Sequence, residues 1–430
     1  MVPGETLTLT VERLAFGGDA VGRTADGRVV FVDRGAPGDR ILVCVDEVRP
    51  RFLRGHRREL LAPGPNHAAP PCPVADRCGG CPWQEVARAT QLASKQELVE
   101  RALRALGGAA IVAPIAPATA SFAYRTRARF AVAQEAIGFH GRRSLEVIEA
   151  PRCAVLHPAL DAALARARAL LRPHLAVGGS LGGLVGRGDA VQLAVSGLGA
   201  AGWSAAATLL GDADGTGGII GVIGDGRRVG AEMIDTAEAG EPPFFAAATG
   251  FAQASAAGNR RLRELVAAAA RAQGKRVLEL HAGDGNFTRD LVPIAASVRA
   301  VESEVEAAAR LRRNVPAATV EPRSAQAAAR SLVDGGASFD LVLLDPPRRG
   351  AKEVMPLLPR LASEVVYVSC DPMTFARDAE ALVAAGLTLE EVTPVDLMPH
   401  TDHVELVACF RRRGTSLGGA ASAPAEGSGS

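Results

Sequence analysis

The first 60 residues alternate apolar and polar side chains in short stretches separated by turn signals. The alternation is clearest at residues 7–11, 28–32 and 40–45, and the dipeptide Asp26-Gly27 favours a tight hairpin turn. Side chains that alternate in this way place one face of each strand in a core and the other in solvent. The pattern therefore predicts a small β-barrel over residues 1–60.

A basic segment at residues 49–58 closes this region. It carries five arginines and no acidic residue, with Phe52 and His56 between them. Arginine and aromatic side chains bind phosphates and bases, but a charged strand is also typical of a solvated sheet edge. The segment is interpreted as a strand edge that is either solvated or used to bind nucleic acid.

The apolar residues of 61–245 recur with no single spacing. This pattern predicts a mixed α+β central domain. Residues 61–83 resemble a loop, with six prolines and three cysteines, and residues 85–106 have helical spacing. Farther along, short apolar stretches alternate with glycine-rich ones. The glycine-rich stretch at residues 178–188 is expected to form a turn.

Between residues 246 and 413 the pattern changes to strands that alternate with helices. We expect strands at 276–280, 297–301, 340–344 and 365–369, and helices at 287–293, 303–313, 352–361 and 373–385. This alternation predicts an α/β domain with a parallel doubly wound sheet and helices on both faces. The Gly, Ser and Ala residues of 414–430 predict a disordered tail.

Composition narrows the possible functions. The 430 residues include 48 Lys plus Arg and 47 Asp plus Glu, a net charge of +1, so any nucleic-acid contact must be a local basic patch. The uncharged run at 190–211 is interpreted as a strand at 191–195 and a helix at 203–210, not as a membrane span. The amino terminus lacks the features of a signal peptide, so we expect a cytoplasmic location and no membrane partner.

Four of the seven cysteines predict a metal site. Cys72, Cys78 and Cys81 form a C-x5-C-G-G-C motif in the proline-rich loop, and Cys153 follows a proline and an arginine much later in the chain. Without an export signal, clustered cysteines are more typical of metal ligands than of disulfides. The intervening Gly and Pro residues favour an iron–sulfur cluster, while four cysteines also satisfy a tetrahedral zinc site.

A glycine turn after the first strand of the α/β region predicts a cofactor site. Gly283 and Gly285 lie between a strand and a helix start, where backbone can approach a ligand closely. Glu302 follows at the end of the next strand, where a carboxylate can accept from both ribose hydroxyls. No pyrophosphate-binding loop is evident, so S-adenosylmethionine fits this turn better than NAD. An ordinary turn beside a surface glutamate is the alternative.

The later strands of this region also end in reactive side chains. Asp345 and Cys370 each follow a buried strand, and ligands of open parallel sheets bind beyond those carboxyl ends. This position favours Cys370 as a nucleophile over a core cysteine. Glu405 leads into the last strand, where it is either a paired surface residue or a general base near Cys370.

Together these motifs resemble the RNA (uracil-5-)-methyltransferases of the RumA/TrmA group, in the branch with an iron–sulfur cluster. The resemblance covers nearly the whole chain and implies an OB-like TRAM barrel at residues 1–60 and a class I, Rossmann-like S-adenosylmethionine methyltransferase domain. It implies a 4Fe-4S cluster held by Cys72, Cys78, Cys81 and Cys153. It also makes Cys370 of SCDPMTFARD the nucleophile and Glu405 the base.

The same resemblance assigns the cofactor contacts. They are Gln253 of FAQAS, His281, Gly283, Gly285, Asn286, Glu302, Ser324 and Asp345 of DPPRRG. Some positions depart from the family pattern. His281 replaces an aromatic beside the adenosine, Ser324 stands where Asn or Asp is usual, and Ser255 and Asp371 replace asparagines.

The resemblance implies methylation of carbon 5 of a uridine in structured RNA, ribosomal in preference to transfer RNA, by a monomeric enzyme. Cys370 would add to carbon 6, carbon 5 would take the methyl group, and Glu405 would remove the carbon-5 proton. Candidate contacts with the RNA backbone are the 49–58 arginines with Arg125, Arg127, Arg129, Arg142 and Arg143. The alternatives are an RNA-binding module with an inactive methyltransferase domain, or methylation of proteins or small molecules.

Overall fold

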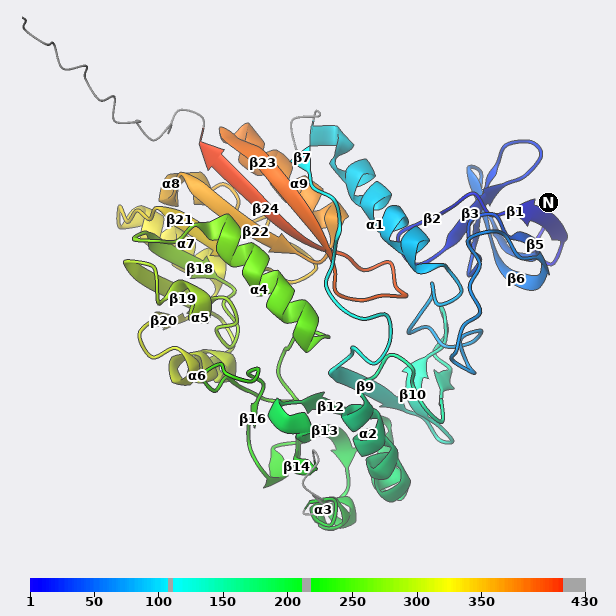
Figure 1. Ribbon diagram of the computed structural model, residues 1–430, viewed down its shortest axis with the longest axis horizontal. Helices are drawn as coiled ribbons and strands as arrows, with labels where there is room; N and C mark the ends of the chain where they lie inside the picture. Colours follow the sequence, from blue (N-terminus) through cyan, green and yellow to red (C-terminus); the bar gives the residue numbers. More distant parts are fainter. Residues whose placement is uncertain (107–110, 211–217, 413–430) are drawn as a thin grey trace, which may run out of the picture.

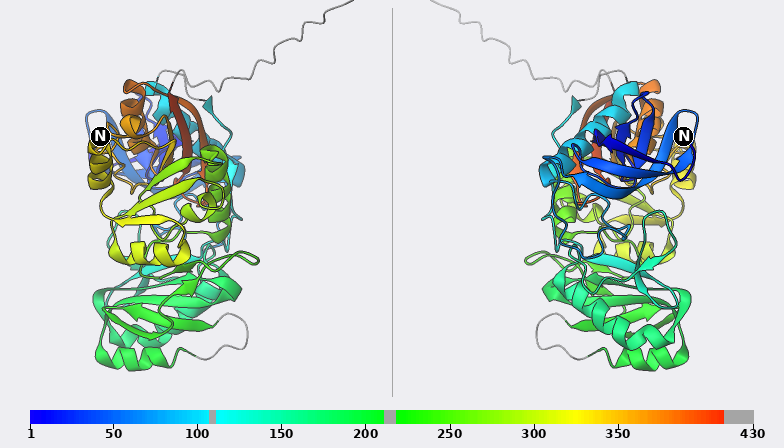
Figure 2. Two further views of the ribbon diagram at one scale, coloured as in Figure 1. Left: turned by 90° about the vertical axis from the view of Figure 1, so that its left-hand side faces the viewer. Right: turned by 90° about the vertical axis from the view of Figure 1, so that its right-hand side faces the viewer.

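The computed structural model describes residues 1–106, 111–210 and 218–412, which form three main sheets (Figure 1). The predicted disordered tail at 414–430 lies outside the described residues. In the views of Figures 1 and 2 the central sheet lies below both the amino-terminal barrel and the sheet of the carboxy-terminal region. Within the described residues, no helix is long and apolar enough to cross a membrane.

The amino-terminal region is a six-stranded barrel-like sheet, as predicted. Its strands are β1 (Thr6–Thr10), β2 (Arg13–Leu14), β3 (Ala20–Arg23), β4 (Val29–Val32), β5 (Arg40–Val48) and β6 (Phe52–Ala62), in the order β1-β5-β6-β4-β3-β2. The turn at Asp26-Gly27 joins β3 to β4, with Gly27 at a φ of 84°. The prediction that residues 49–58 form a strand edge is wrong for residues 52–55, which pair with β5 on one side and β4 on the other, whereas after Gly55 strand β6 pairs with β5 alone.

The central region contains a seven-stranded sheet in the order β11-β10-β9-β12-β13-β14-β15. The strands are β9 (Arg127–Val132), β10 (Ile137–His140), β11 (Val147–Ile148), β12 (Leu175–Val185), β13 (Val191–Leu198), β14 (Ile219–Gly224) and β15 (Arg227–Gly230). It is accompanied by α2 (Pro158–Leu171), η2 (Arg172–His174), η3 (Arg187–Asp189), α3 (Ala200–Ala207) and the pair β16 (Ile234–Asp235) and β17 (Phe245–Ala246).

The glycine-rich stretch at 178–188 does not form the predicted turn. Most of it belongs to β12, which pairs with β9 and β13. Its glycines allow close packing: a Cβ at Gly182 would lie 2.6 Å from the Ala128 carbonyl oxygen. The run at 190–211 does contain a strand, β13, and a helix, α3, as expected.

The carboxy-terminal region has the predicted α/β architecture around a nine-stranded sheet, in the order β20-β19-β18-β21-β22-β24-β23-β7, with β8 also paired to β23. The strands are β7 (Ile111–Val112), β8 (Ala116–Pro117), β18 (Arg276–Leu280), β19 (Ser297–Glu302), β20 (Thr319–Pro322), β21 (Leu341–Leu344), β22 (Glu364–Ser369), β23 (Leu387–Asp396) and β24 (Glu405–Arg412). Strands β18 to β22 are parallel, and β24 is antiparallel to both of its neighbours.

Helices cover both faces of this sheet. They are α1 (Arg88–Leu103) with η1 (Arg104–Leu106), α4 (Ala256–Ala270), α5 (Thr288–Leu291), α6 (Val305–Asn314), α7 (Ala325–Asp334), α8 (Leu358–Leu361) and α9 (Pro372–Ala384). Side chains that alternate along β18 belong to different cores: Leu278 packs in the cluster with α1, α7 and α9, and Val277 packs with α4 and α5. The helix expected at 352–361 is wrong except for its last turn, α8, since turns occupy residues 352–357.

Candidate active site

Cys370 and Glu405 lie opposite one another at the end of two paired strands. Strand β22 pairs with β24 in an antiparallel register whose last pair is Ser369 and Leu406. Cys370 directly follows Ser369 and Glu405 directly precedes Leu406, so both residues lie next to this last pair, and the Glu405 carboxylate is close enough to raise the pKa of the Cys370 thiol. The structure thus brings the two residues together, and Cys370 lines an open cleft.

Asp345 and Arg348 complete the charged groups around this pair. Burial, together with the nearby Asp345, raises the pKa of Glu405 to about 8, and Arg348 opposes this shift. Burial also raises the pKa of Asp345 to about 7. The pKa of the Cys370 thiol is raised to about 11 by burial and by Glu405, and Arg348 again opposes the shift. Arg348 is therefore the cation that favours the ionised forms of both the thiol and the carboxyl group.

The loop at 397–404, between β23 and Glu405, is held by buried polar residues of α1. Lys95 Nζ donates to Asp396 Oδ1 at 2.5 Å and to the Met398 carbonyl oxygen at 3.0 Å. Both Lys95 and Asp396 are fully buried. Gln91 accepts from the His400 backbone N–H at 2.8 Å. These residues, which the sequence analysis missed, fix the path of the loop that leads to Glu405.

Asp378 of α9 supports the segment that carries Asp345 and Arg348. Its Oδ2 accepts from the Ala351 backbone N–H and from the Tyr367 hydroxyl, each at 2.8 Å. Asp371 begins the same helix and accepts from the Thr374 N–H at 2.8 Å. Since Asp and Asn are both good N-caps, this departure from the family pattern preserves the helix start beside Cys370.

The glycine turn and Glu302 are in direct contact. Glu302 Oε2 accepts from the Gly283 backbone N–H at 2.9 Å, and a Cβ at Gly283 would find open space. His281 adopts a left-handed φ of 61°, and its buried Nε2 has no hydrogen-bond partner among the described residues. Burial lowers the pKa of His281, which favours the neutral imidazole. An open turn with a carboxylate and an unpaired ring nitrogen can hold a polar ligand.

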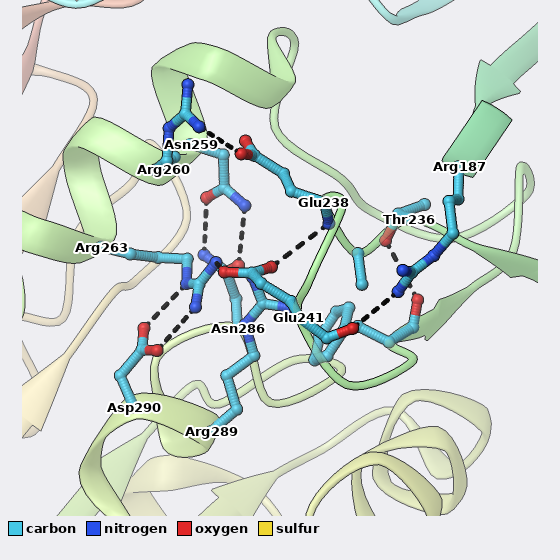
Figure 3. A network of polar contacts seen from close by, with 12 residues as sticks. Arg187, Thr236, Glu238, Glu241, Asn259, Arg260, Arg263, Asn286, Arg289 and Asp290 are labelled. Atoms are coloured by element: carbon cyan, nitrogen blue, oxygen red, sulfur yellow. Dashed lines mark hydrogen bonds and ion pairs between the residues drawn. The ribbon is translucent and has the colours of Figure 1, made fainter. Parts of the chain in front are cut away.

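The side chain of Asn286 forms hydrogen bonds within the protein. Its side-chain amide exchanges two hydrogen bonds with the amide of Asn259 in α4, at 2.9 and 2.8 Å. The pair lies in a polar network that also includes Glu241, which accepts from Arg263 at 2.9 Å and from Arg289 at 3.2 Å (Figure 3). The network joins the segment after β16 to the helices around the glycine turn.

The other two predicted cofactor residues lie at the margins of this region. Ser324 follows β20 and caps α7, where its hydroxyl accepts from the Ala327 N–H at 3.2 Å. Gln253 is half-buried in the segment just before α4. Ser255, which replaces an asparagine, caps α4 and accepts from the Gly258 N–H at 3.1 Å. Its substitution therefore retains a helix-capping side chain.

The four predicted ligand cysteines line one pocket, which they share with Arg125 and Gln84. All four are free thiols, and burial raises the pKa of Cys78, Cys81 and Cys153. Among the described residues, no group of three or more Cys, His, Asp or Glu side chains is arranged to hold a metal ion. The structure therefore brings the four cysteines together without a preformed single-ion site.

A cleft of about 700 Å³ runs past Cys370. Its lining comes from the barrel, the loop at 61–83 (the cysteine loop), the central sheet and the nine-stranded carboxy-terminal sheet (the catalytic sheet). It includes Phe16, Gly17, Gly80, Arg125, Arg143, Arg348, Cys370 and His403. Some of the candidate RNA-binding arginines donate hydrogen bonds within the protein. Arg127 donates to the Gly250 carbonyl oxygen at 2.5 Å, and Arg142 donates to those of Pro82 and Gly18 at 3.2 and 3.1 Å.

Two family models match the chain. The TRAM domain matches residues 2–56, and the model described as tRNA (Uracil-5-)-methyltransferase matches residues 331–413. A 23S rRNA (uracil(1939)-C(5))-methyltransferase of Chromohalobacter salexigens is 32% identical, over 94% of this chain and 89% of its own. The corresponding protein of Methylococcus capsulatus is 30% identical, over 96% and 98%. A protein of Gloeobacter violaceus described as an uncharacterized RNA methyltransferase is 32% identical, over 96% of this chain and 98% of its own.

A solved structure has the same fold. The tRNA (uracil-54, C5)-methyltransferase of Pyrococcus abyssi, in complex with S-adenosyl-L-homocysteine, superimposes with a TM-score of 0.71. The alignment covers 94% of this chain and all of that protein, at 22% identity. The barrel, the central sheet and the catalytic sheet thus recur together in a known architecture.

Proposed function

Since the chain belongs to the RNA (uracil-5-)-methyltransferase family and is an S-adenosylmethionine-dependent RNA methyltransferase, we propose that it methylates carbon 5 of one uridine in 23S ribosomal RNA. The observation that carries the proposal is the position of Cys370 and Glu405 next to the last residue pair of β22 and β24, with Cys370 in the lining of an open cleft. Two relatives that align over nearly the whole chain are named as 23S rRNA enzymes, which favours ribosomal over transfer RNA.

Mapping of 5-methyluridine in a deletion strain tests this proposal. We expect mass spectrometry of 23S rRNA to show one 5-methyluridine that is lost on deletion and restored by the wild-type gene. Transfer RNA from the same cells serves as the internal control and is expected to keep its modification. Loss of 5-methyluridine from transfer RNA alone would instead assign the enzyme to that substrate.

In the proposed reaction the Cys370 thiolate adds to carbon 6 of uracil, and the resulting enolate makes carbon 5 nucleophilic. Carbon 5 then takes the methyl group from the sulfonium of S-adenosylmethionine, and S-adenosylhomocysteine is released. Glu405 removes the carbon-5 proton, and elimination restores the double bond and releases the Cys370 thiolate. Because a stacked and paired base cannot reach Cys370, the target uridine lies in a loop or is flipped out.

The glycine turn is proposed to hold the cofactor. Glu302 would bind the ribose hydroxyls, Gly283 and Gly285 would leave room for the adenosine, and His281 would flank it. Gln253 and Asp345 would lie toward the methionine end, while Ser324 and Asn286 would border the site. Calorimetric titration with S-adenosylhomocysteine tests the central contact. We expect Glu302→Gln to weaken binding about tenfold, in line with the loss of a charge-assisted hydrogen bond, and an unchanged affinity would refute the assignment.

We further propose that Cys72, Cys78, Cys81 and Cys153 hold a 4Fe-4S cluster. Four free thiols line one pocket from two distant parts of the chain, which suits this donor set. Ligands of a single zinc ion must all lie about 2.3 Å from one point, whereas a four-iron cluster binds each thiolate through a different iron. No step of the reaction transfers an electron, so the cluster would tie the cysteine loop to the segment that carries Cys153.

Removal of one ligand tests the cluster. We expect anaerobically purified wild-type protein to be brown and to contain about four irons, and Cys81→Ser to lose the colour and most of the iron. Cys44→Ala, which removes a thiol of the barrel, serves as the matched control and should keep both. A colourless wild-type protein with stoichiometric zinc would assign zinc to the four cysteines.

A further inference from the structure

The hairpin turn between β2 and β3 extends from the barrel into the cleft. Phe16 and Gly17 of this β2–β3 turn, residues 15–19, line the cleft. Gly17 and Gly18 have φ values of 83° and 82°, which L side chains rarely adopt. A Cβ at Gly18 would lie 2.8 Å from the Pro82 side chain, so the turn packs closely against the cysteine loop.

The same turn contacts the loop that leads to the proposed base. The Gly17 N–H donates to Asp402 Oδ2 at 2.8 Å. Trp83 connects the two segments, because its ring N–H donates to the Gly18 carbonyl oxygen at 3.2 Å and its backbone N–H donates to that of His400 at 2.9 Å. The barrel is therefore built into the wall of the cleft and is not attached by its linker alone.

Asp19 ends this turn and faces three arginines. It is only 2% exposed. Arg143 donates to its Oδ2, Arg54 Nη1 lies 3.3 Å from the same oxygen, and Arg142 Nη2 lies 3.9 Å from Oδ1. A buried carboxylate needs such partners, since burial of an unpaired charge is very unfavourable. The carboxylate therefore fixes guanidinium groups that come from both the barrel and the central sheet.

Among these arginines, Arg143 is the one suited to bind a ligand. Its side chain is 45% exposed and lines the cleft, whereas the side chain of Arg142 is 12% exposed and donates to backbone carbonyls. Arg143 lies in the hairpin turn after β10 with a left-handed φ of 49°. A guanidinium has five N–H donors, and the contact with Asp19 leaves others for a phosphate.

We propose that Asp19 is a positioning residue for the RNA substrate, because it holds the Arg143 guanidinium at the rim of the cleft where an RNA phosphate binds. The inference rests on the proposed function, in which the RNA strand passes through the cleft with its uridine at Cys370. The barrel thereby contributes to substrate binding through a carboxylate that itself never touches the RNA.

Replacement of Asp19 by asparagine separates positioning from simple electrostatics. Loss of a negative charge beside the cleft would by itself strengthen binding of a polyanion. Loss of a positioning contact would weaken it instead. We expect Asp19→Asn to raise the Kd for a fluorescein-labelled oligouridylate about fivefold and to raise KM for RNA with little change in kcat. Unchanged or tighter binding would overturn the inference.

A double-mutant cycle and a matched control complete the test. Arg143→Ala should weaken binding similarly, and Asp19→Asn should add little in that background, whereas additive effects would overturn the inference. Asp334→Asn removes the same charge from an exposed position on α7 and should leave the Kd unchanged. Thermal unfolding verifies that each variant is folded. If the wild-type protein does not bind the oligouridylate, the result contradicts the proposed path of the RNA through the cleft, and with it the role of Asp19.

Discussion

Cys370→Ala is expected to abolish methyl transfer to RNA, with a fall in kcat of at least about 10⁴-fold. Carbon 5 of uracil is too weak a nucleophile to attack the sulfonium unaided, and the thiolate supplies the missing reactivity by adding to carbon 6. The cofactor turn lies on other strands, so binding of S-adenosylhomocysteine should persist in this variant. We therefore expect the loss of activity to appear in kcat and not in cofactor affinity. Transfer of a radiolabelled methyl group to RNA from the deletion strain measures the effect.

The chain offers a matched control for this variant. Cys409 lies on β24, the strand that pairs with the one preceding Cys370, and it packs at the edge of a hydrophobic core. Cys409→Ala therefore changes the same sheet by the same number of atoms without touching the cleft, and it should retain wild-type kcat. Measurable turnover by Cys370→Ala would contradict covalent catalysis by this thiol, whatever the behaviour of the control.

The positions of Cys370, Asp345 and Glu302 could be predicted because each depends on a local rule. A side chain just after a buried parallel strand lies at the edge where ligands bind, and no long-range contact is needed to infer this. Glu405 required chemical analogy as well, since its strand is antiparallel to its neighbours and its register could not be read from the pattern. The register then placed it opposite Cys370.

Residues that hold the site in place could not be predicted in the same way. Lys95 and Asp396 are 301 positions apart in the chain, and Asp19 and Arg143 are 124 apart. In the sequence each of them resembles an ordinary surface charge, and only the folded chain brings the partners together and buries at least one of each pair. Buried ion pairs between distant segments have no sequence period, so neither pattern nor spacing reveals them.

The errors in the fold prediction have local causes. Glycines at 178–188 indicate a turn when read alone, but in β12 they let neighbouring strands approach closely. The stretch at 352–361 has helical spacing, yet Pro356 and Pro359 lack the N–H groups that a continuous helix requires, and only the last turn forms. Residues 52–55 were assigned to an edge because charge indicates exposure and does not indicate that β4 lies beside this part of β6.

Glu405→Gln is expected to trap the covalent protein–RNA adduct. The variant keeps Cys370 and the cofactor site, so addition to carbon 6 and methyl transfer can proceed, but no base removes the carbon-5 proton and elimination stalls. We expect turnover to fall by about 10²- to 10⁴-fold. A band that contains both protein and labelled RNA should survive denaturing electrophoresis. The double variant Cys370→Ala/Glu405→Gln should show no such band.

The pH dependence of turnover gives a second, independent readout of Glu405. Burial, with Asp345 nearby, raises the pKa of its carboxyl group to about 8. Only the ionised form can accept the carbon-5 proton, so wild-type kcat should rise with pH through neutrality and level off above about pH 8 if proton removal limits the rate. Glu405→Gln should lose this rise and retain only the dependence due to the Cys370 thiol, whose pKa is still raised by burial. If no adduct accumulates and the pH profile is unchanged, proton removal belongs to another group. Asp345, with a pKa of about 7, would then be the first alternative base to test by substitution.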